Sequence, residues 1–319
     1  MIKTALFISC VILALTSSVN AQEDPIEKCN LGHAKSCFDL GFLRMTGYMG
    51  VKVDMQSAED FFIKGCKLKG AQSCSALGFI YQKGKNGTKD DNKAREFYKQ
   101  GCDLGDPQGC MALGRLYLDN TKKDVSAKDL AFKAFNQACT LDYAPSCVEA
   151  ALLNEDKALA LYQKGCELKN GKACNLQGEL LAQSDTDKAL SLYQKSCDLK
   201  YGDGCRNLGL TKEGDEQMTL LKHACDLNDL VACNLQGEAL LKNKDENSLT
   251  KARELFKKAC GIHSAKACVN LATMYEQGIF ISKNLEEALD NYMRGCVYGD
   301  KNGCKNAERL APKVENLKK

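Results

Sequence analysis

Cysteines are the residues of this chain whose type and spacing most clearly predict chemistry. There are 19 of them, and all but the first fall into pairs eight residues apart. The pairs are Cys29 and Cys37, Cys66 and Cys74, Cys102 and Cys110, Cys139 and Cys147, Cys166 and Cys174, Cys197 and Cys205, Cys225 and Cys233, Cys260 and Cys268, and Cys296 and Cys304. Successive pairs begin 27 to 37 residues apart, so each pair marks one unit of an internal repeat. A repeat of this period is typical of a solenoid.

The N-terminal stretch predicts that the chain is exported. Residues 1–21 combine a basic start, an apolar run from Ala5 to Leu15 and small residues up to Ala21, which is the pattern of a cleaved signal peptide. The apolar run is too short to span a bilayer. A lipid anchor on Cys10 is the alternative interpretation of the same stretch. We therefore expect a periplasmic or secreted protein without a transmembrane segment.

The compartment determines whether the cysteines are expected to form disulfides. Removal of residues 1–21 leaves eighteen cysteines, an even number in an oxidising compartment, which predicts nine disulfides, each within one pair. Zinc sites use closer cysteine spacings or cysteine and histidine sets, and haem attachment uses Cys-x-x-Cys-His. Neither pattern occurs in the sequence, and we interpret His33, His223 and His263 as surface or capping residues. We expect no metal and no cofactor.

Apolar residues before each first cysteine predict a helix, which we call the B helix. The residue eight positions before the first cysteine is alanine in seven repeats, and Gln217 is the exception. The residue four positions before that cysteine is Phe or Tyr, and Leu221 is the exception. The aromatic residues are Phe62, Tyr98, Phe135, Tyr162, Tyr193, Phe256 and Tyr292. Steps of four residues place alanine, ring and cysteine on one face.

A second helix, the A helix, is predicted to begin near each second cysteine. The residue four positions after the second cysteine is small in eight repeats. These residues are Gly41, Gly78, Gly114, Ala151, Gly178, Gly209, Gly237 and Ala272. A glycine inside a helix costs about 1 kcal/mol relative to alanine, so we expect another helix to approach closely there. Each disulfide would then join the end of a B helix to the start of the next A helix. Closing a nine-residue loop stabilises the fold by roughly 2.5 kcal/mol.

The unit resembles the Sel-one-like repeats, relatives of tetratricopeptide repeats. The resemblance rests on the alanine, aromatic and Gly-Cys or Ala-Cys of the B helix and on stretches such as "KGCKLKGAQSCSALGFIYQKG" and "KACVNLATMYEQG". It implies an all-α, right-handed αα-solenoid over residues 22–310, with about eight helix A/helix B units and a C-terminal capping helix. Residues 311–319 are expected to form a polar tail.

The repeated cysteine pair behind a signal peptide is also similar to the Helicobacter cysteine-rich proteins. That family is described as penicillin-binding with slow β-lactamase activity, and as secreted proteins that meet host cells. Serine β-lactamases use Ser-x-x-Lys together with Ser-Asp-Asn and Lys-Thr-Gly. The sequence has one Ser-x-x-Lys, at Ser248 and Lys251, and lacks the other two motifs. Ser248 is therefore a candidate nucleophile or, alternatively, the N-cap of its B helix.

Two identical "ACNLQGE" runs hold the candidate binding residues Asn175, Gln177, Asn234 and Gln236. We interpret the glutamines as an internal hydrogen-bonding ladder or as part of a ligand-facing groove. Two hypotheses follow. The first is a monomeric scaffold whose concave groove binds a protein, peptide or peptidoglycan fragment. The second is a low-turnover β-lactamase or muropeptide-processing enzyme whose groove holds a β-lactam-like molecule or a muropeptide. The 44 basic and 41 acidic residues are nearly balanced, so nucleic acid is not an expected partner.

Overall fold

The computed structural model describes residues 24–84, 87, 89–119 and 125–317, and all the regular structure in these ranges is helical. The chain divides into two compact units, one up to Asp142 and one from Tyr143 onward. The predicted signal peptide, residues 1–21, lies outside the described residues. Within those residues, none of the helices combines the length and the apolar character needed to cross a membrane.

The helices of the first unit are short and closely spaced along the chain. They are α1 (Pro25–Asn30), α2 (Ala34–Thr46), the 3-10 helix η1 (Tyr48–Gly50), α3 (Met55–Lys67), α4 (Ala71–Lys83), α5 (Asp91–Asp103), α6 (Pro107–Asp119) and α7 (Val125–Thr140).

The second unit continues the same alternation of helices. It holds α8 (Ala144–Leu153), α9 (Glu155–Glu167), α10 (Gly171–Leu181), α11 (Thr186–Asp198), α12 (Gly202–Leu210), α13 (Gly214–Asp226), α14 (Leu230–Leu241), α15 (Glu246–Gly261), α16 (Ala265–Gln277), α17 (Leu285–Val297) and α18 (Lys301–Leu317).

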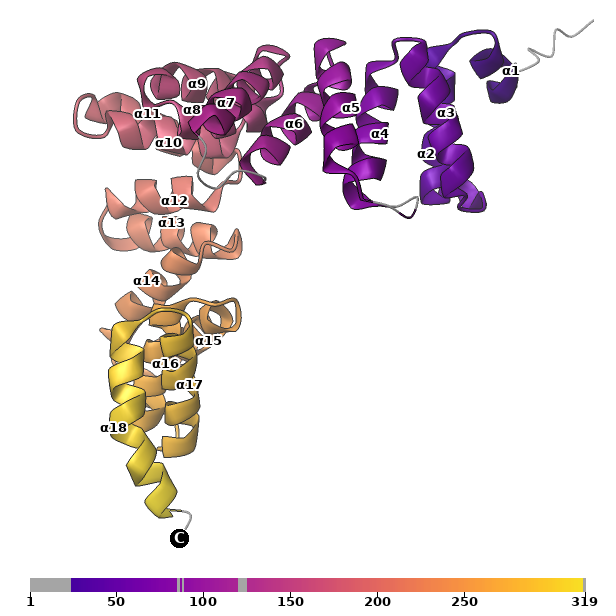
Figure 1. Ribbon diagram of the computed structural model, residues 1–319. Helices are drawn as coiled ribbons and strands as arrows, with labels where there is room; N and C mark the ends of the chain where they lie inside the picture. The colour runs from indigo at the N-terminus through magenta and orange to yellow at the C-terminus, as the bar shows by residue number, and fades with distance from the viewer. Residues whose placement is uncertain (1–23, 85–86, 88, 120–124, 318–319) are drawn as a thin grey trace, which may run out of the picture. The chain divides into compact units, whose positions relative to one another are not determined.

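The predicted alternation of B and A helices is confirmed. The odd-numbered helices are B helices and the even-numbered ones are A helices, and within each unit every helix packs against its neighbours in sequence. Within the second unit, Figure 1 shows α15, α16, α17 and α18 lying side by side as an antiparallel array. The all-α helical repeat fold predicted from the sequence is therefore correct.

The link from a B helix to the next A helix has one recurring conformation, shown by α3 and α4. Lys69 has a left-handed φ of 61°. Its N–H donates to the Cys66 carbonyl, and the Gly70 N–H donates to the Gly65 carbonyl, both at 2.9 Å. These two hydrogen bonds form a Schellman motif. Gly70, the last residue of this motif, is also the N-cap of α4. Within the units, the equivalent residue is also left-handed at Gly32, Gly105, Lys169, Lys200, Asn228, His263 and Gly299.

This link explains why the cysteines are always eight residues apart. Because the end of one helix and the cap of the next share a residue, the link has a fixed length. It places the last turn of the B helix against the first turn of the A helix, where two cysteine side chains can meet.

The structure contains disulfides at eight of the predicted pairs, with Cα–Cα distances of 4.5 to 4.8 Å. The bonds join Cys29 to Cys37, Cys66 to Cys74, Cys102 to Cys110, Cys166 to Cys174, Cys197 to Cys205, Cys225 to Cys233, Cys260 to Cys268, and Cys296 to Cys304. The remaining pair, Cys139 and Cys147, straddles the boundary between the units. Both cysteines are disulfide-bonded, and their pairing with each other stays a prediction.

In five A helices the small residue is a glycine that contacts the aromatic ring of the following B helix. A β-carbon at Gly78 would lie 2.6 Å from the Tyr98 ring, closer than packed atoms approach. The same relation joins Gly41 to Phe62, Gly114 to Phe135, Gly178 to Tyr193 and Gly237 to Phe256. The rings are buried in every case. The close approach predicted from the glycines is therefore confirmed, and its partner is the B-helix aromatic residue.

The C-terminal helix is longer than predicted. α18 continues to Leu317, so most of the predicted polar tail at 311–319 is helical. Leu310 and Val314 are buried and belong to a cluster with Ala288 and Tyr292. Because this helix packs its apolar stripe on α17, it closes the end of the second unit's core.

Candidate interaction face

One register position of the four A helices α8, α10, α12 and α14 carries side chains of alternating character, exposed in the first three and half-buried in the fourth. It is the fifth residue after the second cysteine, and it is occupied by Leu152, Glu179, Leu210 and Glu238 in α8, α10, α12 and α14. We call these four residues the A-face row. Leu152 is 57% exposed and Leu210 is 53% exposed. The row therefore offers apolar, acidic, apolar and acidic groups to solvent in the order of the repeats.

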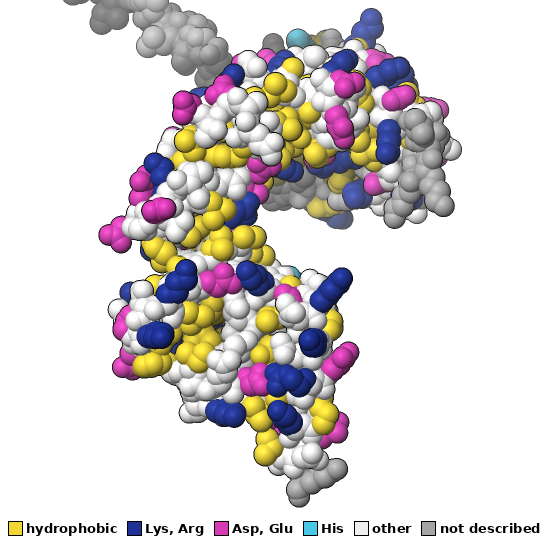
Figure 2. All heavy atoms as spheres, turned by 90° about the vertical axis from the view of Figure 1, so that its left-hand side faces the viewer, with side chains coloured by type: hydrophobic (Ala, Val, Ile, Leu, Met, Phe, Trp, Pro, Cys, Tyr) yellow, Lys and Arg dark blue, Asp and Glu magenta, His cyan; other side chains and the backbone are white. Residues whose placement is uncertain are grey.

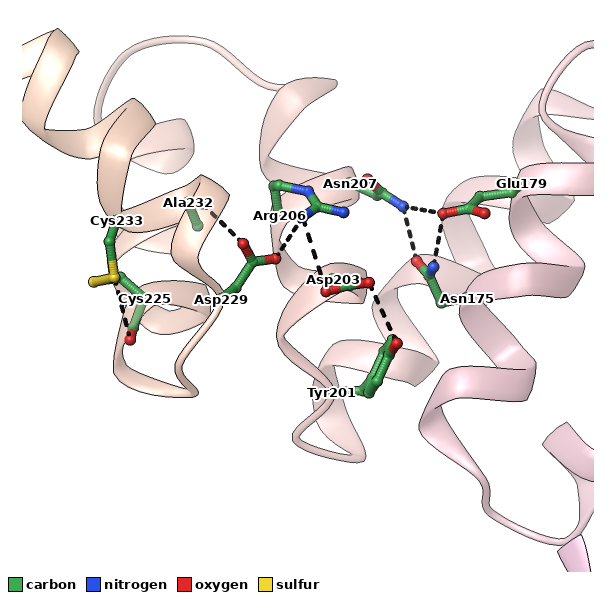
Figure 3. Close-up of polar contacts among 10 residues, drawn as sticks. All are labelled: Asn175, Glu179, Tyr201, Asp203, Arg206, Asn207, Cys225, Asp229, Ala232 and Cys233. Atoms are coloured by element: carbon green, nitrogen blue, oxygen red, sulfur yellow. Dashed lines mark hydrogen bonds and ion pairs between the residues drawn. A yellow bond between two sulfur atoms is a disulfide. The ribbon is translucent and has the colours of Figure 1, made fainter. Parts of the chain in front are cut away.

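Glu179 is held by two asparagines from neighbouring A helices. Its Oε1 accepts hydrogen bonds from the amide nitrogens of Asn175 (2.8 Å) and Asn207 (3.0 Å), and Asn207 also donates to Asn175 Oδ1 at 2.8 Å. Figure 3 shows Asn175 and Glu179 on one helix facing Asn207 on the next. We call Asn175, Glu179 and Asn207 the first triad. Because Asn175 is almost fully buried, the carboxylate is fixed from beneath.

A second triad repeats this arrangement two repeats later, with Asn234, Glu238 and Asn270. Glu238 Oε1 accepts from Asn234 at 3.0 Å and from Asn270 at 3.1 Å, and Asn270 donates to Asn234 at 2.8 Å. Here a cation is added, because the Lys266 ammonium lies 3.1 Å from Glu238 Oε1. Burial opposes ionisation of Glu238, but hydrogen bonds from Asn270, Lys266 and Asn234 outweigh it and lower its pKa.

The charge of Glu179 acts on three tyrosine hydroxyls. Burial, followed by the charge of Glu179, raises the pKa of both Tyr162 and Tyr193. Burial, the Asp203 carboxylate and Glu179 raise the pKa of Tyr201 to about 12. These phenols therefore stay protonated at neutral pH, and the Tyr201 hydroxyl donates to Asp203 Oδ2 at 3.3 Å.

An ion pair ties the first triad's helix α12 to the start of α14. Arg206 Nη1 lies 2.8 Å from Asp229 Oδ2 and 3.8 Å from Asp203 Oδ1. Asp229 also caps α14 by accepting from the Ala232 N–H at 2.9 Å, as Figure 3 shows. Its side chain is only 1% exposed, and burial raises the pKa of its carboxyl against the effect of the Ala232 N–H and of Arg206.

The sequence-based candidates Asn175 and Asn234 belong to these triads, whereas the glutamines do not. Gln177 is buried and Gln236 is half-buried. Among the described residues, neither glutamine makes a side-chain hydrogen bond. The hydrogen-bonded ladder predicted for the glutamines is made by the asparagines instead. Its partners Asn207 and Asn270 were missed, although both stand two residues after a second cysteine.

Ser248 occupies the first turn of α15, but it is not the N-cap that the sequence suggested. Asp245 caps the helix and accepts from the Ser248 N–H at 2.9 Å. The Ser248 hydroxyl accepts from Asn243 Nδ2 at 3.3 Å. Lys251 is exposed one turn further along the same helix. The contacts of Ser248 are those of a residue in a helix N-terminal turn.

The three histidines occupy different surroundings. His33 precedes α2, and His263 has the left-handed link conformation with its ring against Tyr298. His223 is exposed, but its Nδ1 lies 3.6 Å from Cys197 Sγ and 3.7 Å from Cys205 Sγ. These three atoms are close enough to hold a metal ion, yet metals bind thiolates and the two sulfurs are joined in a disulfide. We therefore assign no metal to this group.

The first unit carries different chemistry at the same register. The fifth residue after the second cysteine is Phe42 in α2 and Phe79 in α4. Both line a 280 Å³ pocket together with Phe38, Met45 and Tyr98. The alternation of acidic and apolar groups is therefore limited to α8, α10, α12 and α14 of the second unit, since the same position holds Thr273 in α16 and Arg309 in α18. On the face that Figure 2 presents, hydrophobic patches are interrupted by side chains of both charges.

Antiparallel helix pairs, one repeated link and local disulfides define a helical-repeat scaffold. The family model described as Sel1 repeat matches residues 34–69, 71–106, 148–170, 171–201, 233–260 and 265–294, more than half of the chain. The chain belongs to the Sel1 repeat family.

Two solved structures share this fold over most of the chain. A Sel1 repeat protein from Oxalobacter formigenes is 18% identical, with a TM-score of 0.71 over 91% of this chain and 90% of that one. A protective antigen of uropathogenic Escherichia coli strains, described as displaying an SLR fold, is 20% identical, with a TM-score of 0.68 over 90% of this chain and 66% of that one.

A curated relative matches over a shorter stretch. Cytochrome c oxidase assembly factor 7 of Xenopus tropicalis is 38% identical over 69 residues, which are 21% of this chain and 30% of the relative. The chain thus spans less than a third of this relative and about two thirds of the antigen. Membership of the narrower cysteine-rich family stays a prediction.

Proposed function

We propose that the chain is an exported scaffold whose second unit binds an extended protein segment along the A-face row. The observation that supports this most strongly is the exposure of Leu152 and Leu210, which alternate along the row with two oriented carboxylates. Exposed apolar side chains that alternate with fixed polar groups are typical of surfaces that bind a partner. The local disulfides fit a protein that works in an oxidising space outside the cytoplasm.

The spacing of the row suits an extended chain. Packed helices lie roughly 8–10 Å apart, and an extended segment advances about 3.3 Å per residue. A bound segment would therefore pass about three residues for each repeat. We expect its apolar side chains to meet Leu152 and Leu210, with polar or cationic side chains between them.

The slow β-lactamase activity implied by the cysteine-rich resemblance has weaker support. Ser248 and Lys251 are its only sequence candidates, and the contacts of Ser248 with Asp245 and Asn243 are those of a helix start. A serine nucleophile also needs a base and an oxyanion hole. These contacts favour a role for Ser248 at the start of α15 over a role as a nucleophile. We therefore propose the scaffold function and not the enzyme.

Photo-crosslinking tests the proposal. A benzoylphenylalanine replaces Leu210 or Leu152 on the row or, as a control, Val297, which is 80% exposed on the B helix α17. We expect the same partner peptide to be crosslinked from Leu210 and from Leu152, and not from Val297. A synthetic copy of that peptide should bind the purified chain and lose about tenfold in affinity, or about 1.4 kcal/mol, with Leu210→Asp but not with Val297→Asp. Equal crosslinking from Val297, or equal affinity of the Leu210→Asp variant, would contradict the proposal.

A further inference from the structure

The two triads are chemically identical but differ in whether the chain supplies a cation. In both, a glutamate Oε1 accepts hydrogen bonds from two asparagine amides that lie on neighbouring A helices. The second triad also holds the Lys266 ammonium, 3.1 Å from Glu238 Oε1. The second triad therefore shows how this arrangement binds a primary ammonium group.

The first triad has an acidic residue where the second has its lysine. Lys266 stands two residues before the second cysteine of its repeat, and the equivalent residue for the first triad is Asp203. Asp203 accepts from the Tyr201 hydroxyl at 3.3 Å and lies 3.8 Å from Arg206. Arg206 itself is directed to Asp229 at 2.8 Å. Among the described residues, Glu179 has its two asparagine donors and no ion-pair partner.

The charges around the first triad favour a cation. Glu179, Asp203 and Asp229 are three carboxylates, and Arg206 is the cation paired with the last two. Glu179 is exposed, so its outer side is open to a ligand while Asn175 and Asn207 hold it from the helices. A fixed carboxylate in a negative setting attracts a positive group before any contact forms.

We propose that the first triad binds the ammonium group of a lysine side chain from the partner segment, in the place that Lys266 takes against the second triad. This inference rests on the proposed function, because it names the chemistry that the A-face row recognises. One oxygen of Glu179 is held by the two amides, and the ammonium pairs with that carboxylate as Lys266 does with Glu238. The neighbouring phenol of Tyr201 is a further polar group at the site.

The test uses a small lysine-like probe and a variant whose own lysine side chain would occupy the first triad. The probe is Nα-acetyl-lysine amide, titrated into the oxidised, ¹⁵N-labelled chain while the side-chain amide signals of Asn175 and Asn207 are followed by NMR. Nα-acetyl-norleucine amide, which lacks the ammonium, is the control probe. We expect saturable shifts with the lysine probe alone, and weaker binding as salt is added.

Asp203→Lys supplies the internal ammonium that the first triad lacks. We expect this variant to bind the probe at least about tenfold more weakly, and Glu179→Gln to do the same by removing the charge. Lys266→Asp is the matched reverse change, and it should create new shifts at Asn234 and Asn270. The unfolding midpoint of each variant is measured first, so that a loss of fold is distinguished from a loss of binding.

Two results would overturn the inference: equal shifts with the norleucine probe, or unchanged probe affinity in Asp203→Lys and Glu179→Gln. The proposed function is judged separately, by the crosslinked peptide and Leu210→Asp. If that peptide depends on Leu210 but the lysine probe does not bind, only the ammonium site is wrong. If the probe binds and the peptide is independent of Leu210, only the extended-segment proposal is wrong.

Discussion

At the scale of single residues, Asp229 shows how one buried carboxylate joins consecutive repeats. It accepts from the Ala232 N–H at the start of α14 and pairs with Arg206 of α12. Burial of a charge is costly unless the charge is both paired and hydrogen-bonded. The pair therefore stabilises the stacking of two repeats only while both members are present.

Arg206→Ala should destabilise the chain strongly, and in a pH-dependent way. Burial already raises the pKa of Asp229, and removing the Arg206 charge raises it further. A carboxyl whose pKa is higher in the folded than in the unfolded chain contributes stability at low pH, which is lost as the pH rises through the folded pKa. We expect a loss of about 3 kcal/mol in the free energy of unfolding at pH 7 and a smaller loss at pH 4, measured by urea denaturation.

Lys222→Ala is the matched control for this change. Lys222 pairs with Asp226 at 2.7 Å, but both side chains are more than half exposed. Exposed pairs contribute about 0.5 kcal/mol or less, so this variant should change little at either pH. An Arg206→Ala loss that is the same at pH 4 and at pH 7 would show that the charge of Asp229 is not its cause.

At the scale of helices, the packing of an A helix on the next B helix depends on one missing methyl group. Gly78→Ala places a β-carbon 2.6 Å from the Tyr98 ring of α5. Overpacking of this kind costs about 1–3 kcal/mol, which exceeds the gain of up to about 1 kcal/mol from the better helix propensity of alanine. We expect a lower thermal midpoint for Gly78→Ala, followed by circular dichroism.

Gly261→Ala is the control, because nothing lies within 4 Å of a β-carbon at this position in α15. It should raise the midpoint through helix propensity alone. If Gly78→Ala also raised the midpoint, the glycine would not be needed for the approach of the ring.

The sequence predicts these helices well because their signals are local. Cysteine, aromatic and alanine lie on one face of a B helix, and the small residue of the A helix marks a close contact. Both signals are set by the helical period within one repeat. The repeat with Leu221 in place of the ring also keeps its fold, and there Gly209 faces Leu220.

The triads were harder to predict because they join different repeats. Asn175 follows its cysteine by one residue, whereas its partner Asn207 follows the next cysteine by two. This offset depends on the stagger between stacked helices, which one sequence does not state. The identity of the two "ACNLQGE" runs was the available signal, and it pointed to the glutamines as readily as to the asparagines.

At the scale of the whole molecule, the disulfides supply stability that short repeats lack. Each closes a nine-residue loop, worth roughly 2.5 kcal/mol in the unfolded-state entropy model. Eight such bonds lie within the two units. Their combined effect is larger than the free energy of unfolding of a typical domain, which is about 5–15 kcal/mol.

We therefore expect the reduced chain not to refold. The protein is unfolded in denaturant with or without a reductant and then diluted into buffer, and helix content is measured by far-ultraviolet circular dichroism. The oxidised chain should recover its helical signal, and the reduced chain should lose most of it. A reductant added without denaturant is the control, and it should act slowly because nearly all the paired cysteines are buried. Full recovery of the reduced chain would show that the repeats are stable without the bonds.

The recurring link also affects the order in which the disulfides can form. Both sulfurs of a bond belong to one short link, such as Cys66 to Cys74. On the proposed export route, a bond can therefore close once that link has emerged from a translocation channel. It does not have to wait for any later repeat. Oxidation can then keep pace with emergence from the N-terminus onward, and the nearest correct thiol is always available before a wrong one arrives.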